Sequence, residues 1–274
     1  MRHVPMRLLV VGLTLLALGA GRHATAAADE RDPVYQGKRL SEWIAALKET
    51  DDAARTAAIA ALVKIGKPAV VPLAAALKDA NKDVRYGAAE ALGDIGLEAK
   101  RAVSALAASL KDKETEVRMK SAYALGMIGP EAKAAVIPLI EALKDVDTTV
   151  RREAAGALGK MGPAAKAAVA PLIDLLRKDE NAVTRQFAAG ALGMIGPAAK
   201  AAVAPLADAL KDKEGYVRQA AAGALGLLGP EAKEALPALL LLLKDDVEEV
   251  RNVAAAAIRK IDEGGLKKED RPPK

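Results

Sequence analysis

The sequence predicts an all-α fold, a right-handed solenoid of seven stacked helical hairpins. A unit of 30 to 34 residues recurs. Some of its positions hold the same residue types from unit to unit, whereas the positions between them vary. Residues 84–96 read VRYGAAEALGDIG, and residues 117–129 read VRMKSAYALGMIG. Aromatic residues make up only 2% of the chain, whereas hydrophobic residues make up 51%. Apolar surface that is spread over many small side chains suits helices packed in thin layers.

The first 28 residues have the layout of a secretory signal peptide. Two arginines precede the 14 uncharged residues LLVVGLTLLALGAG, and alanines at 24, 26 and 28 offer A-x-A cleavage sites. This apolar run is shorter than the roughly 20 residues that a spanning helix needs. We therefore expect export to the periplasm or the cell exterior, with no stable membrane insertion after cleavage. A retained short anchor is the alternative. Residues 29–38 are expected to form a linker.

Residues 39–263 contain three columns of residues that recur in register. A glycine ends each unit, an arginine opens its second half, and an aspartate lies six residues before the arginine from the second unit on. The arginines are Arg55, Arg85, Arg118, Arg151, Arg185, Arg218 and Arg251. The aspartates are Asp79, Asp112, Asp145, Asp179, Asp212 and Asp245. Because one such unit cannot bury its apolar face alone, the units must stack.

Each unit is expected to hold two helices. In residues 136–145, VIPLIEALKD, apolar residues recur at i, i+3, i+4 and i+7, which is one face of a helix. Pro138 lies near its start, where a missing amide donor costs little. A polar turn with Asp147 as a candidate N-cap leads into the second helix. That helix ends at a glycine, which proline follows in four units, as at Gly129.

The three columns resemble HEAT-like repeats of the bacterial, phycobilisome-lyase-like type. Units of that type read as an apolar helix ending in Asp, followed by V-R-x-x-A-A-x-A-L-G-x-I-G. Residues 217–229, VRQAAAGALGLLG, match this pattern nearly position by position. The resemblance covers residues 39–263 and departs at Thr184, which is inserted before the arginine, and at Ala54, where valine is missing. It implies that the aspartate and arginine columns, from Asp79 and Arg85 onward, form a ladder between repeats.

The second helix of each unit has a constant side and a variable side. Counted from the arginine at 100° per residue, positions +3, +4, +7 and +10 form the core stripe, and positions +1, +2, +5 and +9 lie opposite. The resemblance implies that second helices line the concave side. Aromatic residues and Met beside Arg and Gln are typical of adaptable binding surfaces; alternatively, the rings only widen a thin core. The candidate binding residues are Tyr86, Glu90, Met119, Tyr123, Met127, Arg152, Gln186, Phe187, Met194 and Gln219.

The residue inventory excludes several kinds of catalytic site. The chain has no cysteine, and its two histidines, His3 and His23, lie in the signal segment. Ser-His-Asp and Cys-His nucleophiles and His-ligated zinc are therefore excluded in the mature chain. Deoxyhypusine hydroxylases of the same family need His-Glu pairs for iron, and bilin lyases act on a cytosolic partner. Glu90 and Asp94 could support carboxylate chemistry, but acids at i and i+4 are typically solvated. We expect neither enzymatic activity nor a cofactor.

Charge does not favour nucleic acid as the partner. The formal net charge is +5, but removing the three arginines of residues 1–28 leaves 38 basic against 36 acidic residues. No basic block stands out beyond Lys267 and Lys268. We therefore expect non-catalytic binding of a protein or peptide along the concave side. The alternative is an accessory subunit or lyase-like enzyme related to the bilin lyases or deoxyhypusine hydroxylases.

The last unit departs from the pattern. Leu241 stands where other units carry Glu141, Asp174 and Asp208, and Arg259 replaces a recurring glycine. Residues that depart from the pattern are expected in a terminal repeat, which has no following neighbour. We therefore favour a role in capping the stack over a contact between two copies of the chain. Residues 264–274, GGLKKEDRPPK, are polar and are expected to be disordered. At the other end, Trp43 is expected to seal the stack.

Overall fold

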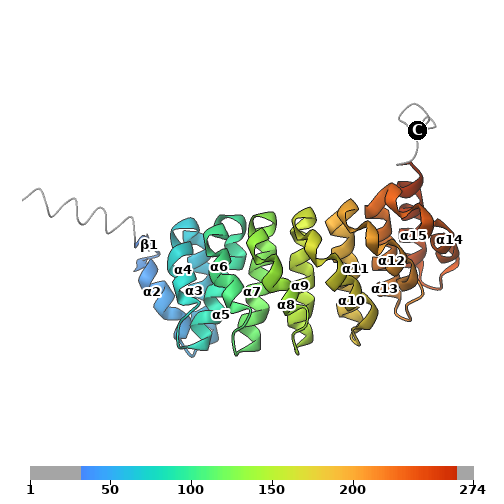
Figure 1. The fold of residues 1–274 in the computed structure, drawn as a ribbon. Coiled ribbons are helices and arrows are strands. Elements are labelled where there is room, and N and C mark those ends of the chain that lie inside the picture. Colours follow the sequence, from blue (N-terminus) through green and yellow to red (C-terminus); the bar gives the residue numbers. More distant parts are fainter. Residues whose placement is uncertain (1–31, 264–274) are drawn as a thin grey trace, which may run out of the picture.

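The computed structural model describes residues 32–263, which form a row of stacked helical hairpins (Figure 1). The predicted signal peptide and C-terminal tail lie outside these residues. The first helices of the hairpins are α2 (Leu40–Ala45), α4 (Val70–Ala76), α6 (Val103–Ser109), α8 (Val136–Ala142), α10 (Val169–Lys178), α12 (Val203–Ala209) and α14 (Leu236–Leu241). The second helices are α3 (Asp52–Ile65), α5 (Lys82–Ile95), α7 (Thr115–Ile128), α9 (Thr148–Lys160), α11 (Ala182–Ile195), α13 (Gly215–Leu228) and α15 (Glu248–Glu263). The all-α solenoid prediction is confirmed.

The segment expected to be a linker contains a small antiparallel hairpin. Strand β1 (Val34–Tyr35) pairs with β2 (Lys38–Arg39) directly before α2. The indole nitrogen of Trp43 donates a hydrogen bond of 3.0 Å to the backbone oxygen of Tyr35, and Trp43 is buried. This bond ties the hairpin to the first repeat, so the ordered fold begins before residue 39.

Short 3-10 segments link each second helix to the next first helix. They are η2 (Lys67–Ala69), η3 (Gly96–Ala102), η4 (Gly129–Ala135), η5 (Gly162–Ala168), η6 (Gly196–Ala202) and η7 (Gly229–Ala235). The column glycines at these junctions have φ between 58° and 73°, a conformation that favours glycine. The predicted glycine stops are thereby confirmed. Two further 3-10 turns, η1 (Ala46–Lys48) and η8 (Leu242–Lys244), extend the first helices of the end repeats.

Two runs, Thr115–Ala142 and Ala182–Ala209, are long and apolar enough by composition to cross a membrane, and the bent pair Asp52–Ile65 and Lys67–Ala76 would make a third. Each long run comprises a second helix, its 3-10 link and the next first helix. Half of its apolar window is buried inside the solenoid. The apolar character of these runs therefore also serves the solenoid core.

Neighbouring second helices touch at their backbones. A Cβ atom added to Gly193 would lie 2.7 Å from the Cα atom of Ala224, and one added to Gly159 would lie 2.9 Å from that of Ala191. The same glycine-to-alanine contact recurs at every junction from α5 to α15. First helices of neighbouring repeats contact each other much less closely. Because a stack bends toward its tighter layer, the second helices line the concave side.

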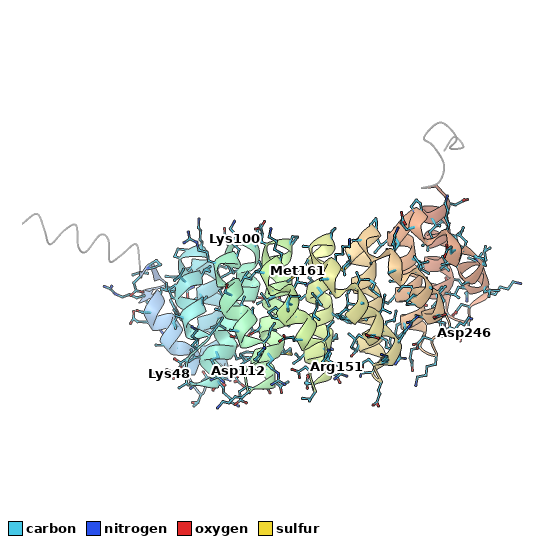
Figure 2. All side chains as sticks on the ribbon, viewed as in Figure 1. Lys48, Lys100, Asp112, Arg151, Met161 and Asp246 are labelled. Atoms are coloured by element: carbon cyan, nitrogen blue, oxygen red, sulfur yellow. The ribbon has the colours of Figure 1, made fainter. Side chains whose placement is uncertain are left out.

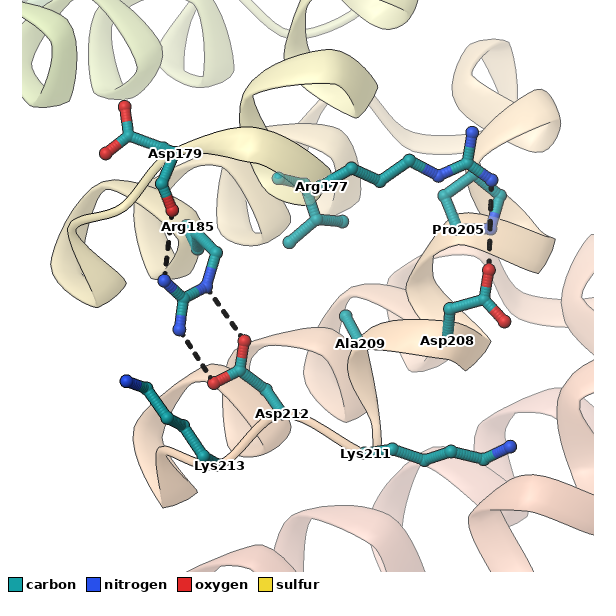
Figure 3. Close-up of a pocket in the computed structure, with 10 residues that line it drawn as sticks. Arg177, Asp179, Arg185, Pro205, Asp208, Ala209, Lys211, Asp212 and Lys213 are labelled. Carbon is teal, nitrogen blue, oxygen red and sulfur yellow. Dashed lines mark hydrogen bonds and ion pairs between the residues drawn. The ribbon is translucent and has the colours of Figure 1, made fainter.

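Arginine–aspartate pairs tie each repeat to the next along one edge. Arg185 donates from Nε and one terminal nitrogen to both carboxylate oxygens of Asp212, at 2.8 and 2.9 Å, and from its other terminal nitrogen to the backbone oxygen of Asp179 at 3.0 Å (Figure 3). Such forked pairs are stronger than neutral hydrogen bonds. The other pairs are Arg85–Asp112, Arg118–Asp145, Arg151–Asp179 and Arg218–Asp245.

The ends of the predicted ladder differ from its middle. Arg55 pairs with Asp52, so the Asp79 carboxylate lacks an arginine partner and keeps only the bond of 2.8 Å from the Asn81 backbone amide, of the kind that the other ladder aspartates also accept. The link η2 has three residues where the links η3 to η7 have seven, which offsets the first repeat. Arg251 bonds to the backbone oxygens of residues 245 and 246 and meets no carboxylate within residues 32–263. Asp79 and Arg251 are therefore not linked across a junction as expected.

Replacing Gly193 by alanine is expected to destabilise the fold by up to about 2 kcal/mol. Alanine gains about 1 kcal/mol of helix propensity over glycine. The new methyl group would lie 2.7 Å from the Ala224 backbone, and such overpacking costs about 1–3 kcal/mol. Gly190→Ala is the matched control, because no atom lies within 4 Å of its added Cβ, and it should stabilise the fold. Urea unfolding measures the free energy of unfolding of both variants. An equal change in the two variants would contradict the close contact at Gly193.

Two buried hydroxyl groups are expected to lower stability. The Ser121 and Thr184 hydroxyl oxygens are buried and have no hydrogen-bond partner among the described residues. A buried unsatisfied polar group costs about 1–3 kcal/mol. The same positions hold Ala154 and Val150 in the fourth repeat. Ser121→Ala and Thr184→Val should therefore each raise the free energy of unfolding by about 1 kcal/mol. If thermal melts and urea titrations instead give a lower free energy of unfolding for the variants, these hydroxyls form hydrogen bonds in the folded protein.

Acid is expected to weaken the ladder. Burial alone would raise the pKa of Asp112, Asp145 and Asp212, but hydrogen bonds from arginine and a backbone amide lower it. The bond from Arg218 lowers the pKa of Asp245 from 3.8 to about 2. A carboxyl with a lowered folded-state pKa stabilises the fold above its unfolded pKa, and this is lost as pH falls through the folded value.

The free energy of unfolding should therefore fall as the pH drops from 3.8 toward about 2. Asp245→Asn should be less stable than the native chain at neutral pH and should lose less stability across that window, because asparagine does not titrate there. Urea titrations at several pH values measure both effects. An unchanged slope in the variant would contradict this role for Asp245.

Candidate functional site

The concave face is formed by the sides of α5, α7, α9, α11 and α13 that point away from the core, at positions +1, +2, +5 and +9 from each arginine. All ten predicted binding residues lie on these helices, and none is fully buried. Three of them are exposed: Met127 at 41%, Phe187 at 37% and Met194 at 49%. The side chains are therefore accessible, as a binding surface requires.

The charged and aromatic groups of α5 and α7 are already engaged with one another. Lys120 Nζ lies 2.6 Å from a Glu90 carboxylate oxygen. The same nitrogen lies 5.4 Å from the Tyr86 ring centroid and 5.6 Å from that of Tyr123, within cation–π range. The Tyr123 hydroxyl donates to Asp94 at 3.2 Å. This part of the concave face is a closed network rather than a set of free groups.

Three groups of this network, Lys120, Tyr86 and Tyr123, have raised pKa values. Burial alone would lower the pKa of Lys120, but the hydrogen bond and charge of Glu90 raise it above its ordinary value. Burial, and then the charges of Glu90 and Asp94 respectively, raise the pKa of Tyr86 and Tyr123. The pKa values of Lys120, Tyr86 and Tyr123 therefore lie further above neutrality than their ordinary values.

The side chains of α9 continue this network toward α11. The Arg152 guanidinium lies 5.6 Å from the Phe187 ring centroid and 3.3 Å from a Glu153 carboxylate oxygen. Lys160 Nζ lies 3.3 Å from the Met127 sulfur and 5.8 Å from the Tyr123 ring centroid. Phe187 is thus partly covered by a cation, although its ring remains accessible.

The concave positions of α11 and α13 carry no charge. Three large apolar side chains are exposed there: Phe187 at 37%, Met194 at 49% and Leu227 at 52%. Leu227 is not among the predicted binding residues. Its position, +9 from Arg218, lies opposite the core stripe, so the angular pattern of the sequence already places it on this face. The uncharged concave residues are Gln186, Phe187, Gly190, Met194, Gln219, Ala220, Gly223 and Leu227.

The solenoid also has cavities at its repeat junctions. One of about 410 Å³ between α10 and α12 is lined by the Arg185–Asp212 pair and by Arg177 and Asp208, which lie 3.8 Å apart (Figure 3). Another of about 270 Å³ lies between α3 and α5, and two of the predicted binding residues, Tyr86 and Glu90, line it. Within residues 32–263, no three His, Cys, Asp or Glu side chains are placed to hold a metal ion.

A row of exposed lysines runs along the edge opposite the ladder. Figure 2 places Lys100 on one edge and Asp112 and Arg151 on the other. The links η3 to η7 each contribute one lysine, and these are 33 or 34 residues apart, which is why no basic block appears in the sequence. The row is Lys100, Lys133, Lys166, Lys200 and Lys233. Glutamates in three of these links interrupt it, and the absence of nucleic-acid binding stays a prediction.

Several solved structures share this architecture. An engineered protein is 25% identical, covers 82% of this chain and 69% of its own, and has a TM-score of 0.60. The archaeal HEAT-like repeats protein from Thermococcus onnurineus NA1 is 15% identical, covers 85% and 99%, and has a TM-score of 0.61. Kap121p bound to Nup53p is 14% identical and has a TM-score of 0.62. It covers 81% of this chain but only 29% of Kap121p. At such identities the two natural proteins show the fold alone.

Sequence comparison agrees with the fold. No curated protein matches the chain. The family model for HEAT repeats matches residues 72–159, 132–186 and 169–259. These matches overlap into one continuous stretch, residues 72–259, that includes the ladder, the glycine column from Gly96 on and the concave face. The chain belongs to the HEAT-repeat family.

Proposed function

We propose that this chain is a non-catalytic scaffold that binds a protein or peptide segment along its concave face. The observation that carries the proposal is the exposed apolar patch formed by Phe187, Met194 and Leu227. Solenoids of stacked repeats present extended concave surfaces of this kind. Kap121p, which has the same fold, is bound to a protein in its structure.

The patch supports partner binding better than a purely structural role. Exposed apolar groups that cluster on one face commonly mark interaction sites. Methionine adapts its shape to different partners and is common on binding surfaces. Tyr123, by contrast, is engaged by Asp94 and Lys120, so its ring is less available to a partner. The proposed centre of binding is therefore α11 and α13 rather than the whole set of predicted residues.

The site of action and the lack of catalysis belong to the same proposal. The apolar N-terminal segment and its A-x-A sites support a role outside the cytoplasm. The absence of histidine and cysteine from residues 29–274 supports a binding role over catalysis. The phycobilisome-lyase-like subgroup and the accessory-subunit alternative stay predictions, since no specific contact favours them.

Replacing Met194 and Leu227 by glutamine is expected to abolish partner capture. Truncation of central interface residues typically costs about 2 kcal/mol or more each, or roughly 30-fold in affinity. The immobilised native chain and the double variant are compared for proteins retained from cell-envelope extract, with circular dichroism as the folding check. Val71→Gln with Ile137→Gln is the matched control, because both side chains are 59% exposed on first helices. If the control variant loses as much of the retained protein as the double variant does, the site is not on the concave face.

A further inference from the structure

Concave side chains are arranged in pairs across each repeat junction. Position +5 of one repeat faces position +2 of the next. Lys120 bonds to Glu90 at 2.6 Å in one such pair. In another, the Phe187 ring lies 3.5 Å from the position of a Cβ atom on Gly156. Each time, a long side chain from one repeat covers the helix of its neighbour.

The pair formed by Gly190 on α11 and Ala220 on α13 is the exception. No atom lies within 4 Å of a Cβ atom built on Gly190, because alanine is too short to reach across. The next pair is filled again, since Val253 lies 3.7 Å from the Cβ position of Gly223. The gap is thus flanked by filled junctions on both sides.

Apolar groups surround this gap. Phe187 precedes Gly190 by three residues and Met194 follows it by four, so both lie within about one helical turn on the same face. Their side chains lean toward α9 and border the gap on that side, with the Phe187 ring 3.5 Å from the Cβ position of Gly156 and the Met194 sulfur 3.3 Å from that of Gly159. Leu227 of α13 lies close to α11, with a Cδ atom 3.2 Å from the Cβ position of Gly193. All three side chains are more than one third exposed. A partner side chain that entered the gap would remove parts of them from water.

The charge distribution restricts what can fill the gap. The concave positions of α11 and α13 offer no counter-ion, and an unpaired charge buried there would lose hydration without compensation. The flanking helices carry exposed lysines at position +9: Lys160 on α9, whose amine lies over Met127 of α7, and Lys260 on α15, whose side chain lies over Gly226 of α13. A partner segment with an uncharged side chain in the gap and acidic residues on both sides of it therefore complements this surface.

We infer that the gap over Gly190 and Ala220 anchors one apolar side chain of a partner peptide whose flanking residues carry carboxylates that pair with Lys160 and Lys260. The inference rests on the proposed function and specifies the chemistry of the partner. The exposed Phe187 and Met194 border the anchor site on its α9 side, Leu227 reaches across the α11–α13 junction beside it, and the two lysines set the charge of the flanks. A basic segment would meet like charge at both flanks.

The test is to pan a library of random displayed 12-residue peptides against the immobilised full chain. The enriched peptides should share one large aliphatic or aromatic residue with Asp or Glu on both sides. A synthetic peptide of the enriched sequence is then titrated by fluorescence anisotropy. Gly190→Leu, which fills the gap, should weaken its binding by about 10- to 100-fold, the value of burying one such side chain.

Gly190→Ala is the matched control, because it gives the same backbone change and leaves most of the gap open; its affinity should fall by no more than about threefold. Lys160→Gln with Lys260→Gln should weaken binding at low salt and have little effect at high salt. Circular dichroism and melting temperature check that Gly190→Leu folds as Gly190→Ala does.

The outcomes separate the inference from the proposed function. Peptides that bind Gly190→Leu as tightly as the native chain, yet are lost in Met194→Gln with Leu227→Gln, would overturn the anchor site and leave the concave-face function standing. Enrichment of basic peptides would overturn the acidic flanks. Peptides insensitive to all of these variants, or no enrichment at all, would overturn both proposals.

Discussion

The glycine-to-alanine contact between neighbouring second helices is the constraint on which the rest of the structure depends. At Gly193 the distance to the Ala224 backbone leaves no room for even a methyl group. First helices do not approach each other in this way. The Arg–Asp pairs, such as Arg185–Asp212, join each second helix to the turn that follows the first helix of the next repeat. The unequal spacing of the two layers curves the stack toward the second helices, so their outward positions share one concave surface.

This close approach also determines how the concave surface is filled. Helices that touch at small residues leave a shallow furrow at each junction, and a long side chain from one repeat can lie across it. The junctions of α5, α7 and α9 are covered by charged and aromatic side chains, including Lys120 and Arg152. Between α11 and α13 the covering residue is Ala220, and the furrow stays open. The same contact therefore produces both a closed network and an accessible apolar region.

Much of this could be predicted from the sequence because the repeat period encodes it. The period predicts the hairpins, the glycine column marks the helix ends, and the angular positions identify the concave residues. Relations between repeats could not be predicted in the same way, since they depend on the offset between units. The arginine of one repeat binds the aspartate 27 or 28 residues later. Arg55 does not bind Asp79 of the next repeat, because the short link η2 offsets the first repeat. The gap at Gly190 likewise becomes evident only when adjacent repeats are placed side by side.

The same contact accounts for the end of the stack. Arg259 occupies the column position at which Gly226 admits the Ala257 backbone, so a further repeat could not approach as closely. The last first helix still carries leucines that a next repeat would cover. Leu243 is 40% exposed, whereas its equivalent Leu210 is 2% exposed. Leu241, at 71%, points outward, where no stacked repeat would cover it. An arginine at this position therefore disfavours a further repeat stacked in the same way, and the choice between a cap and a contact between two copies at the exposed leucines of α14 stays a prediction.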